Sequence, residues 1–318
     1  MKYFVTGGAG FVGSSMVDRL LSLGHKVIAY DNGSTGVDRF LECAKASPSF
    51  TLIRGDILDL PKLTGAMQGC DFVFHFAANA DIRDNLRHPE YVFEQNAQGT
   101  FCVLEAMRAN GIDKIAFSST GSVYGEPEIF PTPEDAPFPT QTSLYAASKA
   151  YGEGMITSYC EGYGFTGHIF RFVSLLGERY PHGHVFDFVR KLRDDPSKLL
   201  ILGNGHQRKS YLYIGDCLNA MLTAVEHPCE KVNIYNLGTD EYCEVKESAG
   251  WIAAKIGASP EFIFTGGERG WVGDSPFIYL DTQKIRSLGW EPKLTIRQSV
   301  ERTVDYLLAN PWIFEVRK

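Results

Sequence analysis

The chain has 318 residues, of which 44% are hydrophobic and 22% are charged, so it can bury a large core and is not a disordered protein. Its formal net charge of −7 disfavours contact with phosphate backbones, and we expect no nucleic-acid partner. No apolar run reaches the length of about 18 residues that a membrane span needs, and the N-terminus lacks a signal-peptide pattern. We therefore expect a cytoplasmic protein with no membrane partner.

Short β-type runs alternate with helical segments through the first half of the chain. The predicted strands are Lys2–Thr6, Lys26–Asp31, Phe50–Arg54, Asp71–Phe76, Lys114–Ser118 and His168–Phe172. Helical spacing covers Phe11–Leu23 and Tyr91–Asn110. This alternation is typical of βαβ units, so we predict an α/β fold with a doubly wound parallel sheet.

The second half of the chain is richer in loops. A proline-rich loop at Pro127–Pro139 is followed by predicted helices at Val185–Arg193 and Ile296–Leu308. Two strand-like runs, Ser210–Ile214 and Asn233–Leu237, are expected to rejoin the main sheet. We therefore predict a sheet domain of residues 1–172, completed by about 210–237, and a smaller interdigitated part of residues 173–209 and 238–318.

A glycine-rich turn joins the first strand to the first helix. Gly7, Gly10 and Gly13 have the spacing G-x-x-G-x-x-G. In such a turn the first glycine allows the sharp bend, the second lets the backbone approach a pyrophosphate, and the third lets helix pack on strand. The N-terminus of the helix adds N–H donors and a positive dipole. The turn therefore predicts dinucleotide binding.

Two acidic residues follow the second and third strands. A carboxylate at Asp31 would accept hydrogen bonds from the adenosine ribose and repel a 2′-phosphate, which favours NAD over NADP. The alternative is a solvated loop aspartate before Asn32 and Gly33. Asp56 follows the third strand and is placed to reach the adenine, although a turn residue is an equal alternative.

Tyr145 and Lys149 lie four residues apart, which puts them on one face of a helix. We expect the Lys149 ammonium to favour the phenolate, and this charge together with the positive nicotinamide ring of NAD to lower the pKa of Tyr145 from about 10 towards 7. A second such pair, Tyr242 and Lys246, follows no site-like loop and is interpreted as structural. Upstream of Tyr145, the strand before Thr120 ends in hydroxyl residues at the sheet edge where ligands bind.

These motifs make the chain resemble the extended short-chain dehydrogenase/reductases of the nucleotide-sugar epimerase/dehydratase group. The matching segments, in family order, are Thr6–Gly13, Gly55–Ile57, His75–Ala78, Asn96, Ser118–Gly125, Tyr145–Lys149 and Arg171. The resemblance implies a Rossmann-type fold, NAD as cofactor, a nucleoside-diphosphate sugar as substrate, an NAD-binding first domain and a substrate-binding second part. It also implies a homodimer through the helices carrying Tyr145 and Tyr91–Asn110, where the small residues Ala146, Ala147, Ala150 and Gly154 permit close packing.

The resemblance assigns roles residue by residue. Tyr145 resembles the catalytic acid/base, Lys149 the residue that holds the nicotinamide ribose, and Thr120 the hydroxyl that relays a proton. The cofactor-binding set is Gly7, Gly10, Phe11, Val12, Gly13, Asp31, Asn32, Asp56, Ile57, Phe76, Ala77, Ala78, Asn96, Ser118, Tyr145 and Lys149. The substrate-binding set is Thr120, Ser122, Tyr145, Ser174, Lys209 and Arg269.

The residues after Thr120 select among the family's reactions. Dehydratases and decarboxylases carry an acidic residue there, whereas this chain has Gly121 and Ser122. The pattern is therefore most similar to that of a UDP-glucose/UDP-galactose 4-epimerase. The alternatives are a 4,6-dehydratase or 4-keto reductase of the same fold and, from another class, a non-catalytic dinucleotide-sensing regulator. Intact Tyr145, Lys149 and Thr120 argue against the regulator.

The diphosphate of a nucleotide sugar needs cations, and the family motifs depart from their usual form here. The family arginine aligns with Lys209, so either Lys209 replaces it or Arg208 takes the role. A second cation is expected at Arg269, in the segment 269–274 that includes Trp271, which is expected to pack. Ser174 stands where the family has asparagine, which puts the fit of the substrate in question.

Metal chemistry is not expected. His182 and His184 have no third ligand at fixed spacing, and the seven cysteines form no C-x-x-C pair. Both observations favour structural or solvated side chains and reduced thiols over a metal site or a disulfide framework.

Overall fold

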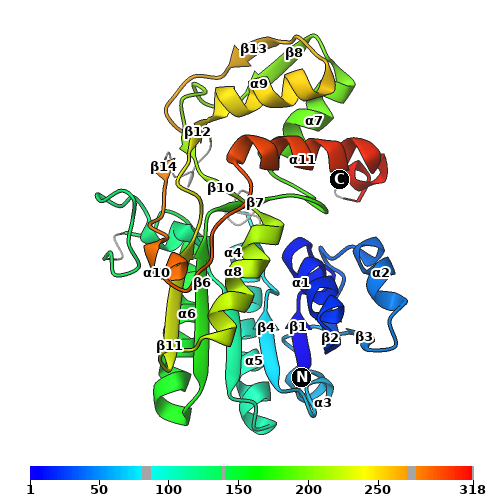
Figure 1. The fold of residues 1–318 in the computed structure, drawn as a ribbon, viewed down its shortest axis with the longest axis vertical. Helices are drawn as coiled ribbons and strands as arrows, with labels where there is room; N and C mark the ends of the chain where they lie inside the picture. Colours follow the sequence, from blue (N-terminus) through cyan, green and yellow to red (C-terminus); the bar gives the residue numbers. More distant parts are fainter. Residues whose placement is uncertain (81–86, 138–139, 271–276, 317–318) are drawn as a thin grey trace. The chain divides into compact units, whose positions relative to one another are not determined.

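A computed structural model describes residues 1–80, 87–137, 140–270 and 277–316. The chain divides into two compact units (Figure 1). Unit 1 comprises Met1–Val123, Ser143–Arg171 and Ala220–Tyr235, and unit 2 comprises Tyr124–Thr142, Phe172–Asn219 and Asn236–Lys318. The backbone therefore passes between the units several times.

Seven strands form the main sheet, in the order β11-β6-β5-β4-β1-β2-β3. They are β1 (Lys2–Thr6), β2 (Lys26–Asp31), β3 (Phe50–Arg54), β4 (Phe72–His75), β5 (Lys114–Ser118), β6 (Thr166–Phe172) and β11 (Val232–Leu237). The pairs from β3 to β6 are parallel, with Phe4 aligned to Ile28 on one side and to Val73 on the other. The predicted α/β fold with a Rossmann-type parallel sheet is confirmed. Its strand order reverses between β1 and β4, where such folds bind ligands.

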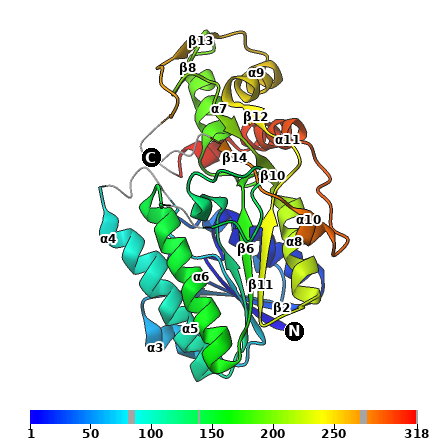
Figure 2. The ribbon, with the colours of Figure 1, turned by 90° about the vertical axis from the view of Figure 1, so that its left-hand side faces the viewer.

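Helices cover the sheet because each presents an apolar stripe to it. On one face lie α3 (Leu60–Ala66), α5 (Gly99–Ala109) and α6 (Leu144–Tyr163), with α5 and α6 side by side in Figure 2. Their buried side chains share a core with strand residues such as Phe4, Val73 and Phe117. α1 (Phe11–Ser22) packs on β1 and β2. Hydrophobic burial of this kind fixes the sheet edge at which the predicted site residues lie.

The predicted helix Tyr91–Asn110 is divided into three segments. α4 (Pro89–Val92) leads into a π-helical segment, Phe93–Gln98, and then into α5. The side chain of Asn96 bonds the backbone of Asn79, outside the helix. A π-helical turn inside an α-helix often marks a functional site, and here it contains one of the predicted residues.

Unit 2 contains three small sheets and most of the remaining helices. The sheets pair β7 (Ser174–Leu176) with β10 (Tyr211–Tyr213), β8 (Lys198–Ile201) with β13 (Glu261–Phe264), and β9 (Arg208–Lys209) with both β12 (Cys243–Glu244) and β14 (Phe277–Ile278). α7 (His184–Asp194), α9 (Val245–Ile256) and α11 (Ile296–Ala309) pack together. Unit 2 also contains α10 (Gln283–Arg286) and η5 (Pro311–Phe314). The division between the units falls within η4 (Gly121–Tyr124) and α8 (Ile214–Glu226), and unit 1 also contains η1 (Asp38–Leu41) and α2 (Glu42–Lys45).

One of the two expected returns to the main sheet is wrong. β11 does join the main sheet, but Tyr211–Tyr213 pairs in parallel with β7 in a separate two-stranded sheet. The chain then enters α8 at Ile214, so the run Ser210–Ile214 is not a strand along its whole length. Its apolar side chains are buried against unit 2 instead of the main sheet, which a pattern of hydrophobicity does not distinguish.

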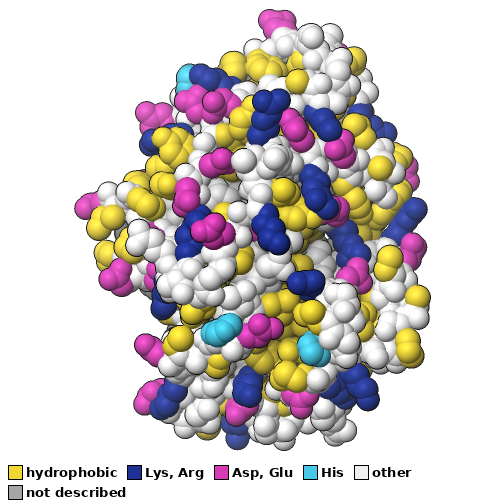
Figure 3. All heavy atoms as spheres, in the orientation of Figure 1, with side chains coloured by type: hydrophobic (Ala, Val, Ile, Leu, Met, Phe, Trp, Pro, Cys, Tyr) yellow, Lys and Arg dark blue, Asp and Glu magenta, His cyan; other side chains and the backbone are white. Residues whose placement is uncertain are grey.

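The surface is mixed in charge. On the face shown in Figure 3, Lys and Arg side chains are interspersed with Asp and Glu. Within the described ranges, no helix combines the length and apolar character needed to cross a membrane. The thiols of all seven cysteines are free, and five of them are buried.

Candidate functional site

The glycine turn after β1 is so tight that it leaves no room for side chains at its three spaced glycines. Gly7 has φ of +65°, and a Cβ there would lie 2.7 Å from the Ala77 nitrogen. A Cβ on Gly13 would lie 2.0 Å from the Gly7 oxygen, and one on Gly10 would lie 3.2 Å from the same atom. α1 begins at Phe11 with no side chain capping its first turn. The N–H groups of Gly7, Gly8, Ala9 and Gly10 have acceptors within the protein, so the N–H groups suited to the pyrophosphate of a dinucleotide are those at the start of α1.

Asp31 is fixed at the end of β2. Its carboxylate accepts hydrogen bonds from the backbone N–H of Ala9 at 2.9 Å and of Gly33 at 2.8 Å. The Oδ2 atom of Asp56 accepts from Asn32 Nδ2 at 2.9 Å. The structure thus brings together the three residues predicted to surround the adenosine, next to the glycine turn.

A buried histidine that we did not predict as a site residue links the end of β1 to α5 at this sheet edge. His75 Nδ1 lies 2.8 Å from Thr6 Oγ1, and its Nε2 lies 3.0 Å from Thr100 Oγ1. The Thr6 hydroxyl also accepts the N–H of Ala77 at 3.2 Å. Burial, with a smaller contribution from Lys149, lowers the pKa of His75 to about 3, so the ring is neutral. A histidine within an apolar strand could have marked His75 in the sequence. Its partners Thr6 and Thr100 could not be read from the sequence, because they come from distant segments.

Asn96 acts as a link between segments. Its Oδ1 accepts the Asn79 N–H at 2.7 Å, and its Nδ2 donates to Asn79 O at 3.0 Å and to Ser148 Oγ at 2.9 Å. Ser118 is similarly engaged, because its hydroxyl donates to His75 O at 3.3 Å. Both were predicted to bind the cofactor, and in the structure their side chains hold the backbone at the same edge as the glycine turn.

Tyr145 and Lys149 lie on the first turns of α6, which Ser143 caps by accepting the Ala146 N–H. The Lys149 Nζ lies 4.6 Å from the centre of the Phe117 ring and 5.9 Å from that of the Tyr145 ring. Only 2% of Lys149 is exposed. The predicted pair is therefore brought together in a dry environment.

Lys149 alone does not lower the pKa of Tyr145 in this structure. Burial raises the pKa of Tyr145 to about 12 and lowers the pKa of Lys149 to about 7, because each charged form loses hydration. The Lys149 ammonium lies near the aromatic rings of Phe117 and Tyr145. The pKa of Tyr145 rises because its phenolate form loses hydration on burial. A phenolate at Tyr145 therefore needs positive charge beyond that of Lys149.

One turn further along α6 is a buried ion pair that the sequence analysis missed. Arg171 Nη2 lies 2.6 Å from Glu153 Oε2, and Arg171 Nε lies 3.0 Å from Glu153 Oε1. Ser119 Oγ donates a short hydrogen bond to the same Oε1 atom. The position of Glu153, four residues after Lys149, was a readable signal, whereas its partners on other elements were not.

Thr120 is buried just beyond β5, at the start of η4. Its Oγ1 accepts the N–H of Ser122 at 3.2 Å, and Ser122 is itself partly exposed. The neighbouring Ser119 N–H donates to Phe170 O at 2.8 Å, which anchors this loop to β6. The loop thus presents its hydroxyls from a fixed backbone.

In unit 2, Lys209 and Ser174 lie in neighbouring small sheets. Ser174 aligns with Tyr211 across the β7–β10 pair, two residues beyond Lys209. The ring of His184 stacks on Tyr211 with centroids 4.6 Å apart and bonds Ser248 Oγ at 2.8 Å. Burial and then the charge of Lys209 lower the pKa of His184 to about 3. His184 is therefore a neutral packing group, as expected.

Arg208 and Arg269 have partners of their own. The Arg208 guanidinium lies 4.0 Å from the centre of the Phe277 ring and 5.7 Å from that of Tyr242. Arg269 forms an ion pair with Glu126, and 45% of its side chain is exposed. Of the motif around Arg269, residues 271–274, including Trp271, lie outside the described residues.

The second Tyr–Lys pair does not share a helix face. Tyr242 precedes α9, which begins at Val245, and 49% of it is exposed. Lys246 forms an ion pair with Glu244 at 3.0 Å. This pair provides an internal control for Tyr145.

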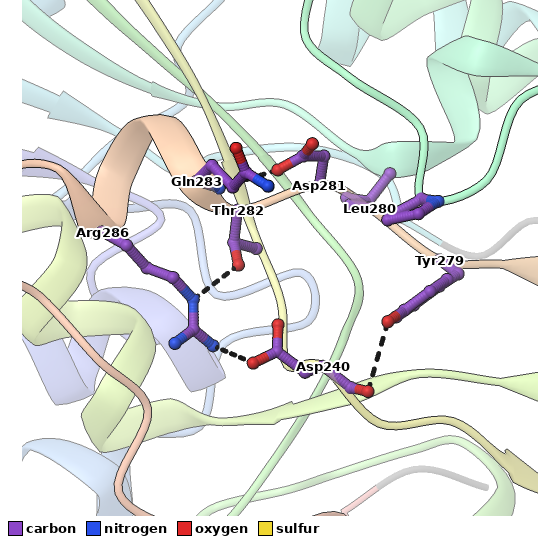
Figure 4. A pocket seen from close by; sticks show the side chains of 8 residues that line it. Asp240, Tyr279, Leu280, Asp281, Thr282, Gln283 and Arg286 are labelled. Carbon is purple, nitrogen blue, oxygen red and sulfur yellow. Dashed lines mark hydrogen bonds and ion pairs between the residues drawn. The ribbon is translucent and has the colours of Figure 1, made fainter.

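A surface hollow in unit 2 contains none of the predicted site residues. Figure 4 shows that its polar side chains bond to one another. Arg286 donates to Asp240 Oδ2 at 2.8 Å and to Thr282 Oγ1 at 3.0 Å, and Tyr279 donates to Asp240 O at 3.2 Å. The Arg286 guanidinium and the Tyr279 hydroxyl are thus engaged within the protein, and we propose no ligand or reaction for this hollow.

The chain was compared with known proteins. The sequence profile described as "NAD dependent epimerase/dehydratase family" matches residues 3–238. A UDP-glucose 4-epimerase of Mycolicibacterium smegmatis is 32% identical over 314 residues, which are 96% of this chain and 98% of that protein. The crystal structure of a UDP-galactose 4-epimerase is 35% identical, with a TM-score of 0.88, and the match covers 98% of this chain and 100% of that one.

A dehydratase is equally similar in fold. A double mutant of a dTDP-glucose 4,6-dehydratase from Streptomyces venezuelae, crystallised with NAD, is 26% identical, with a TM-score of 0.91 and a match covering 100% of both chains. The fold alone therefore does not separate the two reactions. The profile match and the identity over nearly the whole length place the chain in the NAD dependent epimerase/dehydratase family, with NAD as its cofactor.

Proposed function

We propose that the protein is a nucleotide-sugar 4-epimerase that interconverts UDP-glucose and UDP-galactose through a transient 4-keto sugar. Unit 1 binds NAD, and unit 2 supplies residues that bind the nucleotide sugar. The observation that carries this proposal is the conjunction of partly buried Tyr145 and buried Lys149 on α6 with a loop after Thr120 that has no acidic residue at its first two positions. The identity to UDP-glucose 4-epimerases supports the choice of uridine and of hexose.

The protein's part in the reaction is to move one proton and to hold the sugar. NAD, when bound, accepts a hydride from C4 of the sugar and later returns it. The Tyr145 oxygen takes the proton of the 4-hydroxyl and gives it back, and the hydroxyl of Thr120 relays it. Lys149 holds positive charge beside the phenol. Because burial raises the pKa of Tyr145 to about 12, proton release near neutral pH would need this charge together with that of the positive nicotinamide ring.

The loop after Thr120 favours epimerisation over elimination of water. Elimination needs an acid for the leaving oxygen, and Gly121 and Ser122 do not supply one. The nearby Glu126 forms an ion pair with Arg269, so its carboxylate already has a partner away from the loop after Thr120. Lys209 and Arg269 are proposed to bind the diphosphate, with Ser174 beside them in place of the family asparagine. Arg208 is set aside because its guanidinium is stacked on Phe277.

The test is proton NMR of UDP-glucose incubated with the purified protein and no added cofactor. We expect the galacto isomer to appear at equilibrium without net NADH, and denatured protein to release NAD. A 4-keto-6-deoxy product would identify a dehydratase, and consumption of added NAD(P)H would identify a reductase. Tight NAD binding without turnover of any sugar in a panel of UDP-, dTDP-, GDP- and CDP-sugars would favour a sensing regulator.

The protein is also proposed to form a homodimer through α4, α5 and α6. Large apolar side chains are exposed on these helices and on the π-helical segment between α4 and α5: Tyr91, Phe93, Phe101, Leu144 and Tyr151. Clusters of exposed apolar side chains mark interaction sites. On α6, Ala147, Tyr151 and Gly154 follow one another at helical spacing on the exposed face, whereas Ala146 faces the core and does not contribute.

Gly154→Arg tests the dimer without disturbing the protomer. A Cβ on Gly154 would meet no atom within 4 Å, so the substitution has room in the isolated chain. We expect light scattering to give a dimer for the unsubstituted protein and a monomer for the variant. A monomeric unsubstituted protein at micromolar concentration would exclude the dimer.

A further inference from the structure

Glu153 lies at the centre of a buried polar network beside the Tyr–Lys pair. Tyr145, Lys149 and Glu153 follow one another at intervals of four residues, so they share one face of α6. Arg171, on β6, binds both carboxylate oxygens of Glu153, and Ser119 donates to one of them. Lys149, Glu153, Arg171 and Ser119 are all at least nine-tenths buried.

This arrangement holds the carboxylate in one place. Two guanidinium N–H groups and a hydroxyl satisfy its oxygens, and charge-assisted bonds of this kind are short and fix the geometry. A buried ammonium such as that of Lys149 is costly unless a negative charge compensates for it. Glu153 is the nearest such charge along its own helix, one turn away.

The charged groups around Lys149 come from several elements. Tyr145 and Glu153 lie on α6, His75 on β4, and Arg171 on β6. The pKa of His75 is about 3, so its ring stays neutral near neutral pH, and Arg171 is charged throughout. Burial lowers the pKa of Lys149, and Glu153 acts in the opposite direction. Of these groups, Glu153 is the one that favours the ammonium.

We propose that Glu153, fixed by Arg171 and Ser119, is a positioning residue that keeps Lys149 protonated and thereby sets the upper pH limit of the site. Glu153 also ties the loop that contains Thr120 to α6, because Ser119, the residue before Thr120, donates its hydroxyl to the Glu153 carboxylate. The carboxylate itself takes and gives no proton in this role. The proposal extends the proposed function, but its central claim concerns the charge of one lysine.

The experiment titrates Lys149 directly by NMR of protein labelled with ¹³Cε-lysine, with the signal assigned by its absence from Lys149→Met. Glu153→Gln removes the negative charge and takes from buried Arg171 its carboxylate partner, which endangers folding. The double variant Glu153→Gln/Arg171→Met removes both charges and keeps the test available if the single variant does not fold. We expect the Lys149 pKa to fall by about one or more in the double variant, and further in the single variant.

Several outcomes decide between charge compensation and a merely structural role. If the double variant recovers the melting temperature of the unsubstituted protein but keeps a lowered Lys149 pKa, the proposal stands. If the Lys149 pKa is unchanged in the double variant, it is overturned. Glu153→Asp retains the charge and should retain more of the Lys149 pKa than Glu153→Gln. Glu301→Gln, which removes the carboxylate of an exposed pair on α11, is the matched control and should change nothing.

The pH dependence of turnover provides the second measurement. The alkaline limb of kcat/KM should move to lower pH in the double variant, in parallel with the Lys149 titration. If the NMR titration shifts but no sugar is turned over by any form of the protein, the network stands and the proposed function fails. If turnover occurs and its alkaline limb does not follow the titration, the role of Glu153 in setting the pH limit is rejected.

Discussion

The two units hold their predicted site residues in opposite ways. In unit 1, Lys149, Thr120 and Asp31 are all buried, and Thr120 and Asp31 also accept backbone hydrogen bonds. In unit 2, nearly half of the Arg269 side chain is exposed, and its partner Glu126 is also on the surface. The difference indicates that unit 1 fixes the groups that we propose to move protons, whereas unit 2 presents more accessible groups.

The physical reason lies in what each group has to do. A proton-transfer group needs a low dielectric and a fixed geometry, because both change its pKa and its reach. A cation that binds a diphosphate has to meet a ligand arriving from water, so it stays accessible. Changes in unit 1 are therefore expected to act mainly on kcat, and changes in unit 2 on KM.

Tyr145→Phe gives the largest expected effect and tests the unit 1 side of this contrast. Losing a positioned acid/base typically lowers the rate by about 10²–10⁴-fold, here in kcat, while NAD content and melting temperature stay near those of the unsubstituted protein. The measurement is epimerisation of UDP-glucose at saturating substrate. Tyr242→Phe is the control, since that ring lies on the surface, and equal losses in the two variants would show that the site has been misidentified.

Lys149→Met tests how strongly burial acts on the same site, through stability. The pKa of Lys149 is about 7 in the folded protein and about 10.4 in the unfolded chain, so between these values the unfolded chain binds the extra proton. Stability of the unsubstituted protein therefore rises with pH across this window, and the cost of the buried charge is fully present below pH 7.

We expect Lys149→Met to exceed the unsubstituted protein in stability by about 1–4 kcal/mol at pH 6. That margin should shrink steadily from pH 7 to pH 9. Urea unfolding at each pH measures it. A margin that stays constant from pH 7 to pH 9 would mean that Lys149 remains charged through this window, and burial would then not control its pKa.

Lys209→Met is the corresponding change in unit 2. If Lys209 binds the diphosphate, losing it should raise KM by an amount equivalent to about 1.5–3 kcal/mol, the range for hydrogen bonds to charged groups, with little change in kcat. Lys209→Arg should be tolerated, because the guanidinium presents more donors. Steady-state kinetics of the two variants with UDP-glucose provide the measurement. A fall in kcat alone would contradict the division between the units.

The sequence predicted the sheet and the chemistry along single elements better than the contacts between elements. The first six strands, the glycine turn and the Tyr145–Lys149 spacing depend on local periodicity, which a sequence displays directly. The pairing of Tyr211–Tyr213 with β7, the Glu153–Arg171–Ser119 network and the His75 bridges join residues far apart in the chain. The raised pKa of Tyr145 depends on burial by many segments, and spacing alone points the other way.

Glu126→Gln gives the smallest expected effect and tests the unit 2 side most finely. Arg269 and Glu126 form an ion pair with both side chains about half exposed, and such pairs contribute about 0–1 kcal/mol. If Arg269 binds the diphosphate, removing the Glu126 charge releases the guanidinium and removes a repulsion, so KM should fall by about two- to five-fold, within that same energy range. The effect should be lost in the Arg269→Ala background and should weaken as salt is raised, because exposed charges are screened. If Glu126 were instead an acid for elimination, Glu126→Gln would abolish a 4-keto-6-deoxy product and leave KM unchanged, so product NMR and KM together separate the two readings.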